Sequence, residues 1–327
     1  QLCAVGYSAP RVHHCDLGHG LAIIEHLGLK VYGRMMQDGA DMREPLAAAV
    51  EDAAVVGSGA VRPFETHVAI STTSWISSRV PFKRTDLFHS MATIPGLDPA
   101  FPLVGNNQET GGAALQWLRE QIIAPHDGLL GGGSGIGREG MAPERLAPSF
   151  DDLLSLAATA PVGSEGLLFM PWLNGERSPF EDKHLRGGWL NVSLRTDRAM
   201  LVRSVLEGVA YNVRWLFDSY EKFLKQPVPK VRILGGGAQS DLWCQIHADV
   251  LGRPVEQIAD PRNAQLRGVA LWARICLGEL TLEEVPALVP VAQRFEPVNA
   301  SAYVTGYGEY RKLAGTLKGL YHRVNAG

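Results

Sequence analysis

The chain has 327 residues, of which 46% are hydrophobic and 20% are charged, and its formal net charge is -3. These values are typical of a soluble globular protein with room for two domains, and they argue against a disordered chain. The small negative charge argues against nucleic acid as a main partner, and no apolar run approaches the roughly 18 residues of a membrane span. The cysteines lie far apart without paired spacing, as in proteins of the reducing cytoplasm (Cys3, Cys15, Cys244 and Cys276).

Residues 1–49 show weak periodicity and remain unassigned. They contain metal-ligating residue types at His13, His14, Cys15, Asp16 and His19. Adjacent histidines do not easily face one ion, and no second cluster completes a tetrahedron, so we predict no metal site. The chain begins at Gln1 without a basic segment followed by an apolar one, so we also predict no signal peptide.

The pattern becomes clearer from residue 50 onward. Residues 51–61 form a run of small side chains that carries the acidic pair Glu51 and Asp52. An acidic residue at the mouth of a closely packed element is a candidate general base, whereas the alternative is that the pair only favours the start of a helix. Glu51 and Asp52 are therefore both candidates for a general base.

A buried strand is predicted at residues 67–70, and the hydroxyl residues 71–74 follow it directly. A turn of this kind offers hydrogen-bond donors to phosphate oxygens, and the alternative is an edge-strand ladder of serine and threonine. Residues 85–105 contain several prolines and are predicted to be irregular. Residues 108–112 then open a helix at 113–123.

Residues 126–149 are predicted to form a linker or a surface loop. Within them, residues 135–140 match the outline G-x-G-x-x-G of dinucleotide-binding turns. Such a turn needs a strand before it and a helix after it, and the flanking residues predict neither. The context therefore argues against a nicotinamide-linked oxidoreductase.

The middle of the chain alternates helices and strands. We predict a helix at 149–158, strands at 167–171 and 188–194, and a long helix that begins at Thr196 or Asp197. The apolar residues of the long helix recur at helical spacing and are assigned to the core. The loop 172–179 carries Glu176 and Arg177, which the sequence favours as a surface ion pair over a clamp near a cleft.

The stretch Val231–Trp243 is the most informative one. It predicts a short buried strand, then a glycine turn at 235–237, then a helix at 242–251. A helix N-terminus behind a glycine turn presents backbone N–H groups to an anion or a nucleotide, although an ordinary tight connection has the same pattern. Three later elements are predicted: a strand near 255–258, a helix at 265–277 with Gly268 on a small face, and a helix at 307–324 behind a proline-broken loop.

Several of these motifs, in their order along the chain, resemble those of the FGGY carbohydrate kinases, most closely the xylulokinase-like branch. The likeness covers about residues 50–300. The matching stretches are Gly57–Val61, Ser71–Trp75, Gln108–Gly112, Met170–Pro179, Val205–Tyr211, Gly235–Trp243 and Ala248–Val255.

The resemblance implies an α/β protein with the actin-like ATPase (ribonuclease H-like) fold, in which helices flank a mixed sheet. It implies that ATP with Mg²⁺ and a sugar bind in a cleft, and that the γ-phosphoryl group passes to a sugar hydroxyl. The site residues that it implies are Asp52 as the general base, Thr72 and Thr73 with Gly111 nearby for the terminal phosphates, and Gly236, Gly237, Ala238 and Asp241 for the adenosine. A branched side chain at Gly237 is accordingly expected to occupy the space of the adenosine.

The chain departs from the family pattern in two places. The family's Asp normally stands seven residues before the first glycine of Gly57-Ser58-Gly59, where this chain has Val50, and Asp52 is only five residues away. The Asp-x-Gly-Thr motif of the family's N-terminal domain is also missing, and residues 1–49 do not resemble the family.

We therefore expect residues 50–327 to be the C-terminal actin-like domain of a truncated kinase that lacks most of its N-terminal domain. The expected acceptor is a pentulose or a related polyol, and the alternative is a catalytically inactive remnant that still binds nucleotide. We expect a cytoplasmic protein that binds neither nucleic acid nor membranes, and a homodimer is one assembly open to it.

Overall fold

The computed structural model describes residues 52–96, 98, 100–123 and 148–325, together with the backbone of two strands, β1 (Val12–Asp16) and β2 (Leu21–Ile24). The side chains considered as metal ligands at 13–19 and the glycine-rich motif at 135–140 lie outside the described residues. Within the described part, no helix is long and apolar enough to cross a membrane.

The remaining strands are β3 (Thr66–Ile70), β4 (Ser74–Ser77), β5 (Thr85–Asp86), β6 (Met91–Ile94), β7 (Leu103–Gly105), β8 (Leu168–Met170), β9 (Gly188–Leu190), β10 (Val231–Leu234), β11 (Val255–Ile258) and β12 (Val291–Phe295). The α-helices are α3 (Ala113–Trp117), α4 (Phe150–Ala158), α5 (Arg198–Leu224), α6 (Asp241–Leu251), α7 (Ala264–Cys276), α8 (Val285–Leu288) and α9 (Ala300–Val324). Residues 52–58 are also helical, and a π-helical stretch, η4 (Leu118–Ile123), continues α3.

Five strands form the central sheet in the order β12-β11-β10-β3-β4. Strand β10 runs parallel to both β11 and β3, while β12 and β4 run antiparallel to their neighbours, so the sheet is mixed, as the sequence predicts. The register places Leu234 of β10 opposite Ala69 of β3. The two strands therefore end at the same edge of the sheet.

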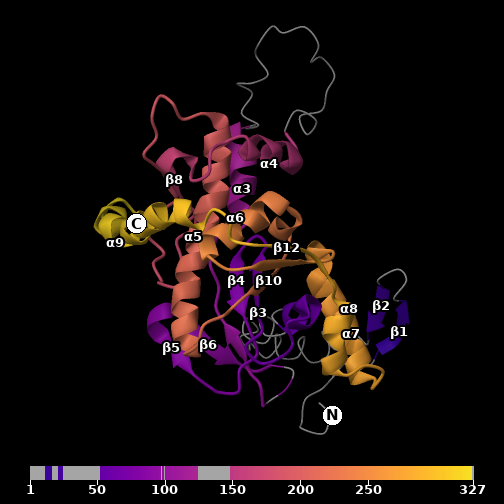
Figure 1. Cartoon of the computed structure of the whole chain (residues 1–327). Coiled ribbons are helices and arrows are strands. Elements are labelled where there is room, and N and C mark those ends of the chain that lie inside the picture. Colours follow the sequence, from indigo (N-terminus) through magenta and orange to yellow (C-terminus); the bar gives the residue numbers. More distant parts are fainter. Residues whose placement is uncertain are drawn as a thin grey trace, which may run out of the picture.

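The two faces of the sheet bury separate cores, because successive side chains of a strand point to opposite sides. Val68 and Ile70 belong to a large core that includes residues of α5, α6 and α9. Ala69 belongs to a smaller core that it shares with helical residues 52–58, α7 and α8. Figure 1 shows α5 and α6 on one side of the strands and α7 and α8 on the other.

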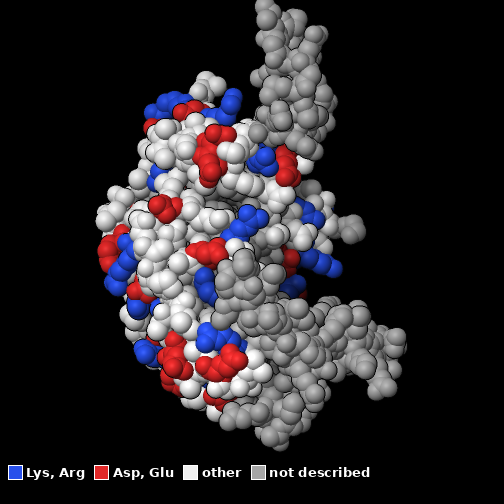
Figure 2. Space-filling model, turned by 90° about the vertical axis from the view of Figure 1, so that its right-hand side faces the viewer, with Lys and Arg blue, Asp and Glu red and all other residues white. Residues whose placement is uncertain are grey.

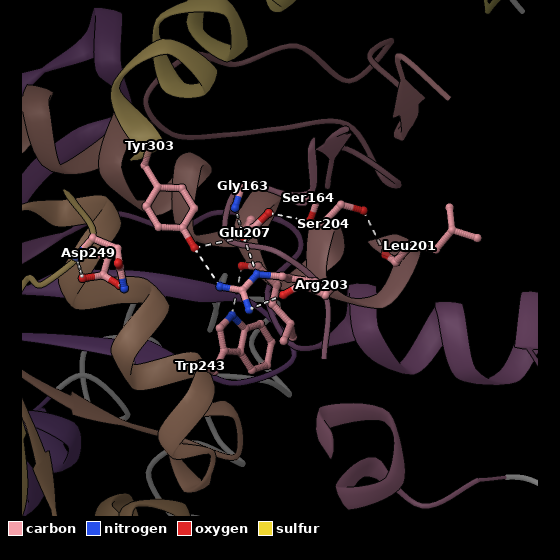
Figure 3. A network of polar contacts seen from close by, with 12 residues as sticks. Gly163, Ser164, Leu201, Arg203, Ser204, Glu207, Trp243, Asp249 and Tyr303 are labelled. Carbon is pink, nitrogen blue, oxygen red and sulfur yellow. Dashed lines mark hydrogen bonds and ion pairs between the residues drawn. The ribbon is translucent and has the colours of Figure 1, made fainter. Parts of the chain in front are cut away.

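The longest helix, α5, carries a buried polar network beside its apolar stripe. Arg203 donates a hydrogen bond to Glu207 at 2.7 Å, and the hydroxyl of Tyr303 in α9 donates to the same carboxylate at 2.9 Å. The amide of Gly163 and the hydroxyl of Ser164 donate to it as well, so the side chains in Figure 3 converge on Glu207. Because every charge in the network is paired, we assign the network to structure and not to chemistry.

Most predicted helices and strands are present, and Asp197 is the N-cap of α5, one of the two residues predicted for it. The prediction of an irregular segment at 85–105 is wrong, because these residues contain the antiparallel sheet β5-β6-β7. Strand β12 lies where a proline-broken loop is predicted, and α9 begins at Ala300, ahead of the predicted start. Strands of two to five residues are too short to show periodicity, and distant pairing partners stabilise them.

Charged side chains of both signs are interspersed on the face of the molecule that Figure 2 shows. A protein that binds nucleic acid through its phosphates usually gathers lysine and arginine on one face. No such gathering is visible among the described residues on this side.

Candidate functional site

Two turns leave the central sheet side by side, one after β3 and one after β10. The second turn begins with Gly235, whose φ is +96°. A Cβ at this position would lie 2.5 Å from the carbonyl oxygen of Ile70 and 2.9 Å from Oγ of Ser71. Glycine is therefore required both by the backbone conformation and by the close approach of the two turns. In open α/β sheets, ligands bind in the crevice outside the carboxyl ends of such strands.

The hydroxyl turn consists of residues 71–73, and Ser74 already belongs to β4. The amide of Ser71 donates to the carbonyl oxygen of Thr73 at 3.0 Å, which closes the turn. Thr72 is exposed and Thr73 is half-buried. Among the described residues, neither the amide of Thr72 nor that of Thr73 donates to a carbonyl, so both amides remain available to an anion.

A pair of glycines supports the hydroxyl turn. The amide of Gly111 donates to the carbonyl oxygen of Thr72 at 2.8 Å, and that of Gly112 donates to the carbonyl oxygen of Ser71 at 2.6 Å. A Cβ on Gly111 would lie 2.4 Å from Oγ of Ser74. Gly111 therefore lies at the predicted phosphate site, but its own amide already has a partner in the turn.

The glycines that follow β10 face different surroundings. A Cβ on Gly236 would have no heavy atom of the described residues within 4 Å. A Cβ on Gly237 would lie 2.5 Å from Cγ2 of Ile70 and 2.9 Å from the ring of Trp243. Ala238 is fully buried as well. The expectation that a side chain at Gly237 enters the nucleotide space is therefore wrong, because it would enter the protein core, and Gly236 is the residue that faces open space.

The start of α6 completes the glycine turn. Oγ of Ser240 accepts a hydrogen bond from the amide of Trp243 at 3.1 Å and so caps the helix. The exposed Asp241 occupies the first helical position. Gln257 of β11 donates to its Oδ1 at 3.2 Å and to the carbonyl oxygen of Ala238 at 2.8 Å. The positive end of the dipole of α6 thus faces the region where Gly236 is open.

A third segment, the loop after β11, borders the glycine turn. The amide of Gly235 donates to the carbonyl oxygen of Pro261 at 2.8 Å. Asp260 adopts a left-handed conformation with φ of +46° and accepts two hydrogen bonds of 3.1 Å from the side-chain amide of Asn263. The glycine turn is therefore held on one side by β3 and on the other by this loop.

Asp52 lies half-buried at the first described position of the helix at 52–58. Its Oδ1 lies 3.5 Å from the position that a Cβ of Gly96 would take, in the connection between β6 and β7. The structure brings the residues predicted to bind the phosphates and the adenosine to one edge of the sheet. The role of Asp52 as general base stays a prediction.

The prediction of a surface ion pair between Glu176 and Arg177 is wrong. Glu176 is only 3% exposed, and its carboxylate accepts hydrogen bonds from the side chain of Asn212 and from the amide of Glu109. Arg177 instead pairs with the side chain of Glu109 at 3.0 Å. Burial raises the pKa of Glu176 to about 7, although the hydrogen bonds from Asn212 and two backbone amides oppose this shift.

The sequence did not single out Gln257 or Asn212. A single amide residue inside a strand or a helix has no characteristic spacing, and its partners here lie 16 to 104 residues away. The only local signal for Glu176 is that it stands in a loop with glycine and proline on either side, where an acidic residue is ordinary.

Mg²⁺ prefers oxygen ligands, which the described residues offer in their carboxylates. None of their acidic, histidine and cysteine side chains forms a group of three that could hold a metal ion. Magnesium in proteins commonly keeps water molecules and binds through one or two carboxylates together with substrate phosphates. The residues therefore fit a magnesium ion that the phosphates of a nucleotide hold, and not a dedicated protein site.

The chain matches a family model described as the FGGY family of carbohydrate kinases, C-terminal domain, over residues 71–277. A xylulose kinase of Staphylococcus epidermidis is 33% identical over 171 residues, which are 50% of this chain and 34% of that enzyme. A gluconokinase of Bacillus subtilis is 25% identical over 281 residues, which are 85% of this chain and 51% of that enzyme. The family match contains both turns but not Asp52.

Among solved structures, the xylulose kinase of Lactobacillus acidophilus resembles the chain with a TM-score of 0.67 at 22% identity. The likeness covers 83% of this chain and 51% of that protein. The chain therefore has the actin-like ATPase fold of these kinases, and it spans at most about half the length of the relatives that it matches.

Proposed function

The chain belongs to the FGGY family of carbohydrate kinases, and from this premise we propose that it binds ATP with Mg²⁺ and takes part in phosphorylating a sugar hydroxyl. The matched relatives are a xylulose kinase and a gluconokinase. Their names support a pentulose or a related polyol as the acceptor. The enzyme is then a phosphotransferase with an alcohol group as acceptor.

The observation that carries this proposal is the adjacency of the hydroxyl turn at 71–73 and the glycine turn at 235–237. Both turns leave parallel neighbouring strands at one edge, and Gly235 allows them to approach. One turn offers exposed hydroxyl and amide donors, and the other offers an open position at Gly236 beside the start of α6. This pairing suits a ligand with an anionic end and a bulky end, as a nucleotide has.

Each residue of the site has a role in this proposal. Thr72 and Thr73 bind the terminal phosphates through amides and hydroxyls, while Gly236, with Gly237 and the exposed Asp241, receives the adenosine. The fully buried Ala238, predicted for the same role, instead holds the turn through its carbonyl oxygen, which accepts a hydrogen bond from Gln257. ATP supplies the phosphoryl group that is transferred. Asp52 accepts the proton of the acceptor hydroxyl. The hydroxyl oxygen forms the new bond to the γ-phosphorus, and the bond between that phosphorus and ADP breaks. Catalysis then consists mainly of positioning.

The alternative is a chain that binds nucleotide without turnover. The family's Asp stands where this chain has Val50, which supports this reading for the catalytic base. The nucleotide contacts do not depend on that position, because they lie within residues 71–241.

We further propose that residues 50–327 form the C-terminal actin-like domain, which the match over residues 71–277 supports. Cys244 is a buried free thiol, which supports a reducing compartment such as the cytoplasm. A homodimer stays a proposal, as does the expectation that the protein does not bind nucleic acid.

Two measurements on the full chain test the function. Isothermal titration with MgADP measures nucleotide binding, and a coupled assay measures ADP release when xylulose, gluconate or glycerol is added. Binding together with sugar-dependent ADP release supports the kinase. Binding with no release for any acceptor supports the inactive alternative, and the absence of nucleotide binding would refute both.

A further inference from the structure

We propose that Glu176 is a positioning residue for the phosphate site, which it serves by holding the segment 108–112 against the hydroxyl turn. The inference rests on the proposed nucleotide function of that turn. Glu176 lies in the loop that follows β8, far along the sequence from the turn, and the residue is 3% exposed. No other part of the proposed function uses it.

The carboxylate has three hydrogen-bond donors around it. Oε1 accepts from the amide of Glu109 at 3.0 Å and from the amide of Arg177 at 2.8 Å. Oε2 accepts from the side-chain amide of Asn212 in α5. Glu176 therefore joins three parts of the chain: its own loop, α5 and the segment that leads to the glycine pair. Hydrogen bonds to an ionised carboxylate are stronger than those between neutral groups.

The same segment is attached to the hydroxyl turn. The amides of Gln108 and Ser74 each donate to the other residue's carbonyl oxygen, at 2.8 and 3.3 Å. The amides of Gly111 and Gly112 donate to the carbonyl oxygens of Thr72 and Ser71. Because Glu176 fixes the amide of Glu109 between these two attachments, a displacement of the segment would move the turn that is proposed to bind the phosphates.

The orientation of Asn212 makes an acceptor necessary at position 176. Its Oδ1 accepts from the indole of Trp172 at 3.3 Å and from the hydroxyl of Tyr310 at 3.1 Å. The side-chain amide of Asn212 must therefore point its N–H groups at Glu176. In Glu176→Gln, one oxygen can still accept from the two backbone amides, but the new side-chain amide then faces that of Asn212, donor against donor.

Among the described residues, few charged groups face Glu176. Glu109 is the charged group that faces it from the segment, and Arg177 is occupied by Glu109. From its own loop, Asp182 exchanges backbone hydrogen bonds with Glu176 and pairs through its side chain with His322 of α9. Helix α5 presents the neutral Asn212, and α9 presents the phenol of Tyr310.

Ionisation has opposite consequences for stability and for position. Burial raises the pKa of Glu176 from the ordinary 4.5 to about 7. The stability that the protonated side chain contributes is therefore fully present below pH 4.5 and is lost as the pH rises through 7. The ionised carboxylate, however, is the form that accepts all three hydrogen bonds. As the pH rises, a positioning role predicts that residues 108–112 become better ordered while the stability of the fold decreases. A purely structural role would not produce these opposite changes.

The test compares the wild type with Glu176→Gln, with the double variant Glu176→Gln, Asn212→Asp, and with the control Glu181→Gln. The double variant exchanges the acid and the amide, so that the new amide donates to the new carboxylate, which still accepts from Trp172 and Tyr310. The control removes an exposed carboxylate from the same loop. Amide hydrogen exchange of residues 105–113 without ligand and the affinity for Mg²⁺ with a non-hydrolysable ATP analogue are measured for each.

In Glu176→Gln we expect the amides of residues 105–113 to exchange faster. At about pH 8 the affinity for the ATP analogue should be about tenfold weaker, because this is the usual effect of losing one hydrogen bond to a charged group. The ratio of wild-type to variant affinity should rise between about pH 6 and about pH 8, since the ligand's own titration cancels in the ratio. The double variant should restore both exchange and affinity, and the control should match the wild type.

Unchanged exchange and affinity in Glu176→Gln would overturn the proposal, as would a folded double variant, judged by near-ultraviolet circular dichroism, that restores neither. A wild-type chain that does not bind the ATP analogue would instead overturn the proposed function on which the inference rests. The two failures are therefore distinguishable.

Discussion

Gly57 and Gly268 lie against each other where the helix at 52–58 crosses α7. A Cβ on Gly57 would fall 1.7 Å from the carbonyl oxygen of Ala264, and a Cβ on Gly268 would fall 1.8 Å from that of Ala53 and 2.8 Å from the amide nitrogen of Gly57. The helix that begins with Asp52 is thus held against α7 by backbone contact. Neither helix can move aside without opening the smaller core of the sheet.

Gly268→Ala should therefore be strongly destabilising. The added methyl group meets backbone atoms on both sides, and overpacking of this kind decreases the free energy of unfolding by about 3 kcal/mol or more. Urea denaturation followed by circular dichroism measures the loss. Gly315→Ala in α9 is the matched control, because its Cβ would meet no atom of the described part of the chain within 4 Å. It should gain about 0.5 to 1 kcal/mol from helix propensity. Equal effects at the two positions would contradict the close crossing.

Gly236→Ala and Gly237→Ala should separate binding from folding. At Gly236 the methyl group enters open space and leaves the fold intact, but it should weaken nucleotide binding about tenfold because it narrows the proposed adenosine space. At Gly237 it meets Ile70 and Trp243 and should reduce stability by about 1 to 3 kcal/mol. Calorimetric titration and thermal unfolding of both variants measure the contrast. Full nucleotide affinity in Gly236→Ala would show that the glycine turn does not receive the adenosine.

Asp52→Asn should abolish sugar-dependent turnover, with a decrease of at least about 100-fold, and leave nucleotide affinity nearly unchanged. The substitution keeps the shape of the side chain but removes the base that accepts the hydroxyl proton. The coupled ADP-release assay and nucleotide titration measure the two quantities. Glu65→Gln is a suitable control, since it removes a half-exposed carboxylate beside the surface residue Arg62. Turnover that survives in Asp52→Asn would mean that another group is the base.

The stability of the protein should decrease in acid because of His67. This residue lies fully buried in β3, and neither ring nitrogen has a hydrogen-bond partner among the described residues. Burial lowers the pKa of His67 to about 3. The unfolded chain takes up a proton below its ordinary pKa of 6.5, while the folded chain stays neutral. The contribution of the neutral, buried His67 to the free energy of unfolding is therefore fully present above pH 6.5 and decreases as the pH falls. The decrease is about 2 kcal/mol at about pH 5.

His67→Leu tests this origin. Leucine fills a similar volume and leaves no polar atom unpaired, so the variant should lose less stability than the wild type between about pH 7 and about pH 5. His247, whose pKa burial lowers to about 4, contributes with the same sign in both proteins and cancels in the comparison. Denaturant titrations at several pH values measure the difference. Parallel pH profiles would show that His67 is not the source.

The sequence predicted the parts of the fold that local patterns describe. The strand, glycine turn and helix at 231–251 have their own signal in three apolar residues, three glycines and a helical run, and they form as predicted. The apolar stripe of α5 likewise forms the core, because its helical spacing repeats along most of the 27-residue helix. The order of the motifs was enough to indicate the family.

The tertiary structure alone decided how the residues of the site are used. Gly236 and Gly237 are adjacent and chemically identical, but β3 brings Ile70 against a Cβ at Gly237, whereas no atom of the described residues lies within 4 Å of a Cβ at Gly236. The sequence predicted a surface position for Glu176, because nothing near it in the sequence indicates its partners Glu109 and Asn212. Residue types and spacing determine which elements form. The direction of a side chain, and whether a carboxylate is buried, depend on neighbours that only the packing of distant segments supplies.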